Sequence, residues 1–347
     1  MEKILFIGLG SIGQRHLKNL KKISKNYKFF ALRKKKSSPE LDLTNKVTNK
    51  RFIAFNNNIT EISEKISKKL KFHSVFICNP SSLHVKTALT YIRNCKHLFI
   101  EKPLSNNMKN IKKLLKLIKL NKINCAVGYQ LRYHPILQKI KKLIEQKKLG
   151  EIKSAYLRNG YYLPYHHKYE DYKKGYAANE KLGGGVILCF IHEIDYANYL
   201  FERPLYISCD GGKKSKLKID VEDHANMMID YKNDKKKFKV KIDIDFIEKI
   251  EKRFCKIIFE KGIIYWNLKK DYLNINLKNK SKIQIKSSFK DRNDLFFKEM
   301  KEVMRDFENK KEPKSNLKNG ITSLQLAIAA KESMHKKNKP IKIKDFL

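Results

Sequence analysis

The sequence predicts a two-domain protein of mixed α/β and α+β class. An N-terminal doubly wound parallel sheet is expected over residues 1–128, and a mostly antiparallel open sheet over residues 129–347. In the first domain, short apolar runs alternate with helix-period segments, a pattern typical of a parallel sheet covered by helices on both faces. A glycine-rich turn joins the first apolar run to the first helical segment. Beyond residue 152 the pattern becomes β-rich.

The glycine-rich turn follows residues 4–7 (ILFI), an apolar run expected to form a strand buried on both faces. Its three glycines are spaced G-x-G-x-x-G and lead directly into a helical pattern. Such glycines permit a tight turn, close approach of the backbone to a pyrophosphate, and close packing of helix on strand. Because the N-terminus of a helix favours anions, a dinucleotide is predicted to bind at Gly8, Gly10, Ser11, Ile12 and Gly13.

The second strand is predicted over Tyr27–Leu32, and the residue that follows it selects between dinucleotides. A carboxylate there would bind the 2′-hydroxyl of NAD, but this chain has Arg33, followed by Lys34, Lys35 and Lys36. These cations could pair with a 2′-phosphate, so NADP(H) is predicted in preference to NAD(H). In so lysine-rich a chain, a solvated basic loop is the alternative interpretation.

Three further strands are predicted in the first domain, over Ser74–Cys78, His97–Ile100 and Ile123–Val127. A helix is predicted over Thr60–Leu70, whereas residues 37–58 are polar and poorly periodic. The carboxyl ends of parallel strands meet at one edge of the sheet, where ligands bind in such folds. The residues that follow the strands, Gly8, Arg33, Asn79 and Glu101, are therefore expected at one ligand-binding edge.

The second domain is expected to begin after a hinge at Gly128-Tyr129-Gln130. Helices are predicted over Val186–Phe201, Asn293–Phe307 and Ile321–Met334, and the last of them can pack back on the first domain. A hairpin turn is predicted at residues 260–262. The predicted strands are Ala155–Arg158, Leu205–Cys209, Ala225–Tyr231, Phe238–Phe246, Phe254–Phe259 and Ile263–Leu268.

The composition restricts the function classes. The formal net charge of +42 would favour phosphate-rich partners. The lysines are spread over the whole chain without a nucleic-acid-binding motif, so an anionic small substrate is the simpler interpretation and specific nucleic-acid binding an alternative. No apolar run approaches the ~20 residues of a membrane helix, and the N-terminus does not read as a signal peptide. The six scattered cysteines suit free thiols in a reducing cytoplasm.

Five motifs occur in order along nearly the whole chain, and together they carry a family resemblance. They are GLGSIGQRH, NPSSLH, EKPLS, GYQLRYHP and GGGVILCFIHEIDYANYLF, which begin at residues 8, 79, 101, 128 and 183. This set resembles the Gfo/Idh/MocA family of NAD(P)-dependent oxidoreductases, whose first domain is a Rossmann fold. The resemblance extends the predicted cofactor site to Asn79, Pro80, His84, Glu101, Lys102 and Gln130.

The resemblance implies hydride transfer between the cofactor and a ring hydroxyl or ketone of a sugar or nucleotide-sugar. Lys102 follows a strand and precedes a proline, and it matches the lysine of the family that polarises the reacting oxygen. His192 matches the histidine that shuttles the proton, and free imidazole titrates near ~6.5, close to a working pH. A looser resemblance of residues 162–176 to polysaccharide-biosynthesis members implies a role in surface polysaccharide assembly.

The candidate substrate-binding residues are an arginine suited to gripping an anion, aromatic side chains that can lie against a sugar ring, and two residues of one predicted helix. They are Arg132, His167, Tyr172, Tyr176, Cys189 and His192. Structural roles are equally compatible with the first four of them. For His192, the family resemblance favours a functional role over a structural one. His166 and His167 with His192 lack the spacing of metal ligands, so no metal is expected.

The chain departs from the family pattern one turn before His192. The family usually has an aspartate there, whereas this chain has Leu188 and Cys189. Neither side chain can accept a charge-assisted hydrogen bond from the imidazole ring. This departure is compatible with a cofactor-binding protein without catalysis, which is one alternative interpretation. A reductase of another substrate on the same scaffold, such as an inositol, an imine or a tetrapyrrole, is a separate alternative. A homo-oligomer is expected, because a large sheet face could pair subunits.

Overall fold

The computed structural model describes residues 1–33, 39–43, 46–51, 58–166, 170–202, 204–233, 236–278 and 281–344. The chain divides into two compact units. Unit 1 contains residues 1–133 and 289–321, and unit 2 contains residues 134–288 and 322–347. The prediction placed all of 129–347 in the second domain, whereas the segment 289–321 joins unit 1.

Unit 1 is built on a six-stranded sheet in the order β5-β2-β1-β6-β7-β8, and every pair is parallel. The chain runs outward from β1 to β5 and then returns to β6, so the strand order reverses between β1 and β6. This reversal is the point at which doubly wound sheets bind ligands. The predicted parallel sheet is confirmed. Its strands are β1 Glu2–Ile7, β2 Tyr27–Leu32, β5 Ile59–Glu61, β6 Phe72–Ile77, β7 Cys95–Ile100 and β8 Asn124–Val127.

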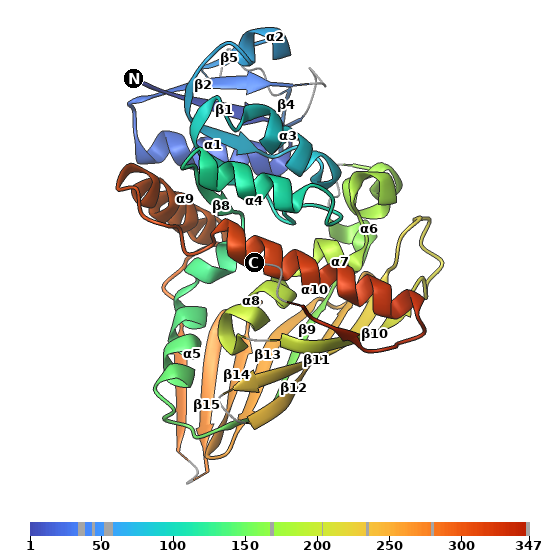
Figure 1. The fold of residues 1–347 in the computed structure, drawn as a ribbon. Helices are drawn as coiled ribbons and strands as arrows, with labels where there is room; N and C mark the ends of the chain where they lie inside the picture. The colour runs from blue at the N-terminus through green and yellow to red at the C-terminus, as the bar shows by residue number, and fades with distance from the viewer. Residues whose placement is uncertain are drawn as a thin grey trace. The chain divides into compact units, whose positions relative to one another are not determined.

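Helices flank this sheet, as Figure 1 shows for α1, α3 and α4. Three phenylalanines from adjacent central strands, Phe6, Phe76 and Phe99, stack with 5.0 Å between the centroids of neighbouring rings. They form the centre of the apolar core and are fully buried. The helices are α1 Ser11–Ile23, α2 Glu64–Ser67, α3 His84–Tyr91, α4 Ile111–Leu120 and α9 Arg292–Glu308, with 3-10 turns at Ser81–Leu83 and Gln130–Tyr133.

Helix α9 packs against α1, which explains why a segment from late in the chain belongs to unit 1. The guanidinium of Arg15 donates to Asn293 Oδ1 at 3.1 Å, and Asn19 and Asn293 exchange amide hydrogen bonds of 3.0 and 3.2 Å. The guanidinium of Arg15 also lies 4.8 Å from the ring centroid of Phe296. A buried polar seam therefore fixes the register of the two helices.

The region between β2 and β6 differs from the prediction. Residues 59–61 form strand β5, which pairs with β2, so the helix predicted over Thr60–Leu70 is reduced to the four residues of α2. An antiparallel hairpin of β3 Pro39–Leu41 and β4 Val47–Arg51 lies within the segment predicted to be irregular. The side chain of Gln14 holds β3, because it accepts from the Leu41 N–H and donates to the Pro39 carbonyl.

Unit 2 is built on a nine-stranded sheet in the order β16-β15-β14-β13-β9-β12-β11-β10-β17. Only the pair of β9 and β12 is parallel among the pairs of this sheet in the described residues. The predicted, mostly antiparallel open sheet is confirmed. The strands are β9 Ile152–Gly160, β10 Pro204–Gly212, β11 His224–Asn233, β12 Lys236–Asp245, β13 Lys252–Phe259, β14 Gly262–Asn267, β15 Tyr272–Leu277, β16 Lys282–Lys286 and β17 Ile341–Lys342.

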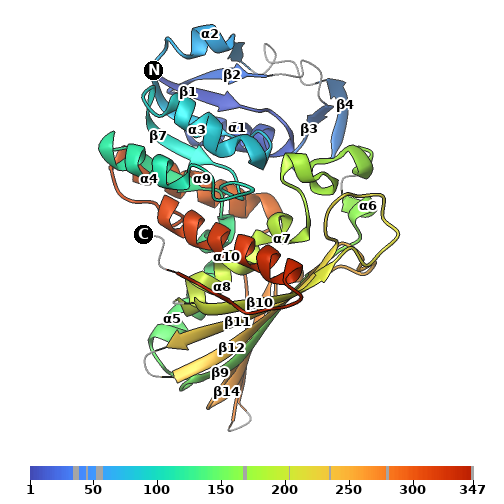
Figure 2. The same ribbon diagram turned by 45° about the vertical axis from the view of Figure 1, so that its right-hand side comes forward.

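Helix α8 covers one face of this sheet and packs on β9, β11 and β12, as Figure 2 shows. The residues of that face include Leu157, Ile242 and Trp266, whose side chains are fully buried. On the opposite face Tyr156, Phe254 and Tyr265 are only partly buried. The helices are α5 Pro135–Glu145, α6 Leu163–His166, α7 Val186–Cys189, α8 Ile191–Phe201 and α10 Leu317–His335, which belongs to unit 2 from residue 322 on.

Two predictions for unit 2 need correction. The helix predicted over Val186–Phe201 is broken at Phe190, where ψ of 26° separates α7 from α8. Strands β15, β16 and β17 were not predicted. Among the residues that the structure describes, no helix is long and apolar enough to cross a membrane.

Candidate active site

The glycine turn after β1 has the geometry that a dinucleotide requires. A Cβ on Gly8, whose φ is +93°, would lie 2.7 Å from the Cys78 carbonyl oxygen, and a Cβ on Gly13 would lie 2.4 Å from the Gly8 carbonyl oxygen. A Cβ on Gly10 would meet nothing within 4 Å. Gly8 and Gly13 therefore allow backbone segments to pack closely within the turn. Gly10 leaves the backbone surface beside it open. These residues fit a pyrophosphate.

No side chain of the described residues caps the N-terminus of α1. Its N-cap is Gly10, without a side-chain cap, and the first turn, which contains Ser11 and Ile12, has no acidic residue. The first amides of a helix have no partner within the helix, and the helix dipole adds a partial positive charge there. The amides of this turn can therefore bind an anion.

Arg33 directly follows β2, as predicted, and forms an ion pair with Glu61, the last residue of β5. Arg33 Nη1 lies 2.7 Å from Glu61 Oε1, and the Arg33 side chain is 4% exposed while that of Glu61 is 37% exposed. The predicted cation is thus positioned at the edge of the sheet, but a carboxylate already shares it. Lys34, Lys35 and Lys36 lie outside the described residues.

Asn79 and Pro80 follow β6 at the same edge of the sheet. Asn79 Nδ2 donates to Thr87 Oγ1 at 2.9 Å, which orients the amide toward α3. His84, the first residue of α3, lies with its two ring nitrogens 2.8 Å from two main-chain carbonyl oxygens, those of Asn79 and Pro103. Burial lowers the pKa of His84, while the two carbonyls oppose that shift. His84 therefore links the loop after β6 to the loop after β7.

Glu101 and Lys102 follow β7, and the Glu101 carboxylate points into the protein. His16 Nε2 lies 2.5 Å from Glu101 Oε1, and the Lys102 main-chain N–H donates to Glu101 Oε2 at 3.1 Å. Glu101 is 7% exposed and His16 is fully buried. The Lys102 residue itself is half-buried, and the peptide bond to Pro103 is cis.

Gln130 and Arg132 lie on the 3-10 turn Gln130–Tyr133, which packs against α9. Both side chains are buried, at 7% and 4% exposure. Of the predicted residues, unit 1 thus brings the glycine turn, Arg33, Asn79, Pro80, His84, Glu101 and Lys102 to the carboxyl edge of one sheet, and Gln130 and Arg132 follow β8.

His192 is the second residue of α8 in unit 2 and is 7% exposed. The glycines that precede its helices are required by the protein's own packing. A Cβ on Gly184 would lie 2.5 Å from the Tyr176 carbonyl oxygen, and a Cβ on Gly185 would lie 2.4 Å from Glu222 Oε1. Glu222 also accepts from the Ile187 N–H at 3.3 Å. The glycine run therefore lets Glu222 reach the N-terminus of α7.

The surroundings of His192 contain buried polar residues on α8. Asp195 is 1% exposed and accepts from the hydroxyl of Ser323 at 2.9 Å. Glu193 is fully buried and pairs with Arg253 on β13, with a distance of 2.8 Å from Arg253 Nε to Glu193 Oε1. Leu188 and Cys189 are buried on α7, so no carboxylate stands one turn before His192.

The other substrate-side candidates of unit 2 lie on short 3-10 turns. Tyr172 and Tyr176 are half-buried, and the hydroxyl of Tyr172 accepts from the Lys218 N–H at 3.4 Å. His167 lies outside the described residues. Among those that are described, no group of three or more His, Cys, Asp or Glu side chains could hold a metal ion.

Two buried residues of unit 1, His16 and Glu299, were not singled out by the sequence. Glu299 on α9 is fully buried, and neither carboxylate oxygen has a hydrogen-bond partner among the described residues. Burial and the Glu101 carboxylate raise the pKa of Glu299 well above its usual value. The available signal was the helical period, because Glu299 falls within the apolar face formed by Phe296, Met300 and Val303.

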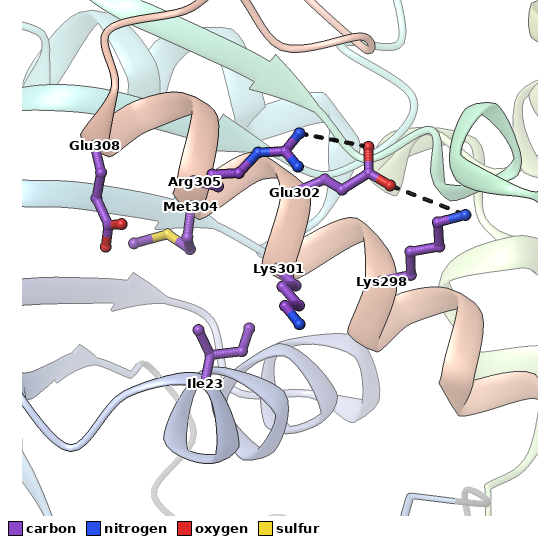
Figure 3. Close-up of a pocket in the computed structure, with 7 residues that line it drawn as sticks. All are labelled: Ile23, Lys298, Lys301, Glu302, Met304, Arg305 and Glu308. Atoms are coloured by element: carbon purple, nitrogen blue, oxygen red, sulfur yellow. Dashed lines mark ion pairs between the residues drawn. The ribbon is translucent and has the colours of Figure 1, made fainter.

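A cavity of about 460 Å³ lies in unit 1 away from these residues. Figure 3 shows Ile23, the last residue of α1, opposite side chains of α9. The glycine turn is at the other end of α1, and a helix of 13 residues is roughly 20 Å long. Glu302 pairs with Lys298 and Arg305, and Glu308 accepts from the hydroxyl of Tyr27, so much of the lining charge is neutralised.

Comparisons with known proteins match both units of the chain. Residues 2–129 match a family model described as an oxidoreductase family with an NAD-binding Rossmann fold. Residues 137–265 match the model of the GFO/IDH/MocA C-terminal domain. Together the two models cover most of the chain.

Curated relatives share 23–27% identity with parts of the chain. One is 2,7-anhydro-N-acetylneuraminate hydratase of Escherichia coli, 27% identical over 157 residues, which are 45% of this chain and 40% of that protein. Another is the NAD⁺-dependent scyllo-inositol 2-dehydrogenase of Bacillus subtilis, 26% identical over 130 residues, which are 37% of this chain and 34% of that protein. The matched segments thus span less than half of each relative.

Solved structures resemble the chain over its whole length. Levoglucosan dehydrogenase in complex with NADH has a TM-score of 0.82 at 16% identity and covers 99% of this chain and 100% of its own. An NAD-binding oxidoreductase from Klebsiella pneumoniae has a TM-score of 0.81 at 14% identity, with the same coverage. At such low identity these structures show a shared fold.

Proposed function

Because the chain belongs to the Gfo/Idh/MocA oxidoreductase family, we propose that it is an NAD(P)-dependent oxidoreductase acting on a sugar or nucleotide-sugar. Hydride transfer would interconvert a ring hydroxyl and a ketone. The observation that supports this most is the geometry of the glycine turn. Protein atoms lie directly against the Cα atoms of Gly8 and Gly13, whereas the space beside Gly10 is open.

The cofactor would be held by the amides of the α1 turn and by residues at the carboxyl edge of the sheet. When bound, the nicotinamide ring accepts or supplies the hydride. Arg33 supports a preference for NADP(H), because its guanidinium can pair with a 2′-phosphate while it remains close to Glu61. The remaining proposed cofactor-binding residues are Gly8, Gly10, Ser11, Ile12, Gly13, Asn79, Pro80, His84, Glu101, Lys102 and Gln130.

Lys102 and His192 are the proposed catalytic residues. The ammonium group of Lys102 would donate a hydrogen bond to the reacting oxygen and stabilise negative charge that develops on it. His192 would exchange the hydroxyl proton, because an imidazole titrates nearer to neutral pH than a lysine does, ~6.5 against ~10.4. Arg132, His167, Tyr172, Tyr176 and Cys189 are proposed to contact the substrate.

The substrate class is supported by the names of two similar proteins, levoglucosan dehydrogenase and scyllo-inositol 2-dehydrogenase. The first is named as a dehydrogenase of levoglucosan and the second as a dehydrogenase of scyllo-inositol. A role in surface polysaccharide assembly in the cytoplasm follows from the looser resemblance of residues 162–176. A homo-oligomer is supported by the partly exposed aromatic row of Tyr156, Phe254 and Tyr265 on the open sheet face.

Turnover with a panel of substrates tests the proposal. The full chain is titrated with NADH and NADPH by fluorescence and then assayed with sugar nucleotides, free sugars and inositols. We expect turnover of a sugar-type substrate and a loss of at least about 100-fold in kcat for Lys102→Ala and for His192→Asn. Wild-type turnover by either variant would overturn its assignment, and a preferred imine or tetrapyrrole would overturn the substrate class.

The second candidate is a cofactor-binding protein without catalysis. It is favoured by Leu188 and Cys189, which place no carboxylate one turn before His192. Tight binding of NADH or NADPH without turnover of any compound in the panel would support it. Restoring a carboxylate with Leu188→Asp or Cys189→Asp would then test whether this position accounts for the inactivity.

A further inference from the structure

The two residues next to Lys102 in the chain each contact a buried histidine, and the two histidines come from different helices. The residue before it, Glu101, contacts His16 of α1, and the residue after it, Pro103, contacts His84 of α3. Both histidines are at most 1% exposed. These contacts fix the main chain on either side of the lysine.

The first contact runs through the Glu101 carboxylate. Its Oε1 lies 2.5 Å from His16 Nε2, and its Oε2 accepts the Lys102 main-chain N–H at 3.1 Å. One side chain therefore joins the lysine to the helix that begins at the glycine turn. Gly128, directly after β8, leaves the space for this carboxylate, since a Cβ there would lie 3.0 Å from Glu101 Oε1.

The second contact runs through the ring of His84. Its Nδ1 lies 2.8 Å from the Pro103 carbonyl oxygen, and its Nε2 lies 2.8 Å from the Asn79 carbonyl oxygen. The ring thus lies between two loops that follow adjacent strands of the sheet, and in its neutral form it donates a hydrogen bond to one of the two carbonyls. A buried hydrogen bond whose partner is lost costs more free energy than an exposed one, so these bridges hold the loops firmly.

We propose that Glu101, His16 and His84 are positioning residues that fix the main chain of Lys102, and that Glu101 ties the lysine to the cofactor-binding helix. This inference rests on the proposed function of Lys102. It assigns to Glu101 and His84 a role directed at the protein's own backbone. A side chain held in one orientation loses less freedom when the substrate binds, and small displacements of a reacting group are costly for turnover.

The test compares Glu101→Gln, His16→Gln and His84→Gln with the control Glu299→Gln. The control changes a buried carboxyl of the same region whose oxygens contact no hydrogen-bond partner among the described residues. Three quantities are measured in the full chain: the dissociation constants of NADH and NADPH, kcat and KM with the substrate identified for the wild type, and the rate of Lys102 acylation by an acetyl N-hydroxysuccinimide ester. Peptide mass spectrometry follows the acylation, with the exposed Lys86 as internal reference.

In the three positioning variants we expect kcat to fall about tenfold, KM to change less than about threefold, and Lys102 acylation relative to Lys86 to rise at least about threefold. The control should match the wild type in all three measurements. Wild-type kcat and acylation in the variants, with only a lower melting temperature, would overturn the proposal. The acylation comparison needs neither cofactor nor substrate, so a wild type that binds no dinucleotide would overturn the proposed function alone.

Discussion

Arg33 Nη1 lies 2.7 Å from Glu61 Oε1, so the cation that follows β2 is paired with a carboxylate at the end of β5. A 2′-phosphate would compete with Glu61 for this guanidinium, which has more than one donor edge.

Removal of the competing carboxylate should strengthen NADPH binding. For Glu61→Gln we expect the dissociation constant of NADPH to fall about threefold with that of NADH unchanged, and for Arg33→Asp we expect the constant of NADPH to rise about tenfold. Fluorescence titration of both nucleotides measures the effect. Equal affinities for NADH and NADPH in the wild type and in Arg33→Asp would contradict the role of this charge.

Substitutions of Gly10 and Gly13 should distinguish an effect on cofactor binding from an effect on folding stability. Gly10 has φ of −71°, and a Cβ there meets nothing within 4 Å, so Gly10→Ala should leave the melting temperature unchanged or slightly higher. The same methyl group would occupy the open backbone surface, and we expect dinucleotide affinity to fall about tenfold or more. Gly13→Ala should destabilise the fold, because its Cβ would lie 2.4 Å from the Gly8 carbonyl oxygen. Thermal melting and nucleotide titration of both variants check this, and unchanged affinity in Gly10→Ala would place the pyrophosphate elsewhere.

The buried carboxyl of Glu299 is expected to lower the free energy of unfolding at neutral pH. Its pKa is raised in the folded state by burial and by Glu101, so the folded protein holds a proton that the unfolded chain releases above its ordinary value of 4.5. The unfolding free energy therefore decreases as pH rises from that value toward the raised pKa. Glu299→Met should remove this decrease and raise stability at pH 7 by about 1–3 kcal/mol, because no buried carboxyl then lacks a partner. Urea unfolding at several pH values measures both effects, and a less stable Glu299→Met protein would show that the Glu299 carboxyl stabilises the fold and contradict this prediction.

His97 is expected to give the opposite pH dependence, so that the free energy of unfolding falls as the pH is lowered. Its ring stacks on Phe307 with centroids 4.6 Å apart and lies 4.7 Å from the ring of His73. Burial, followed by the neighbouring His73 and Lys96, lowers the pKa of His97 to about 4. The folded protein therefore binds fewer protons than the unfolded chain between pH 6.5 and about 4, and stability is lost as the pH falls through that window.

His97→Phe should reduce this acid sensitivity. The phenyl ring preserves the stacking on Phe307 but cannot be protonated. We expect the wild type to lose on the order of 2–3 kcal/mol more than the variant between pH 7 and pH 4.5. Urea midpoints at the two pH values measure the difference, with His335→Phe on α10 as a matched exposed control. Equal acid losses in wild type and His97→Phe would contradict the assignment.

Strands β1, β2, β6, β7 and β8 of unit 1 could be predicted because each contains a continuous apolar run next to a polar loop, and the predicted Tyr27–Leu32 agrees with the observed β2 at both ends. Strand β5 could not be predicted. It has three residues, and it forms because β2 offers an unpaired edge, which is a tertiary condition. The helical spacing of Ile62, Ile66 and Leu70 instead led to the prediction of a helix over Thr60–Leu70, which overlaps this strand.

The glycine turn was predictable because the spacing of its glycines between a strand and a helix is enough to specify its local backbone geometry. The contacts around Lys102 were not. His16 occupies an inward position of α1, where the helical period marks it as one more core residue, and its partner Glu101 lies 85 residues away. The pairing of Arg33 with Glu61 was equally unpredictable, because Glu61 lies on strand β5, which has no recognisable pattern in the sequence.

Unit 1 is completed by a segment that is synthesised more than 150 residues after its first part ends, since α9 covers α1 and stacks Phe307 on His97. A nascent chain on the ribosome that has reached only residue 288 carries these faces exposed to water. Such surfaces attract chaperones and other unfinished chains. Attempts to express the dinucleotide-binding region as residues 1–133 should therefore yield an aggregating fragment, whereas a circular permutant or a fusion that supplies residues 289–321 in the same polypeptide should remain in solution.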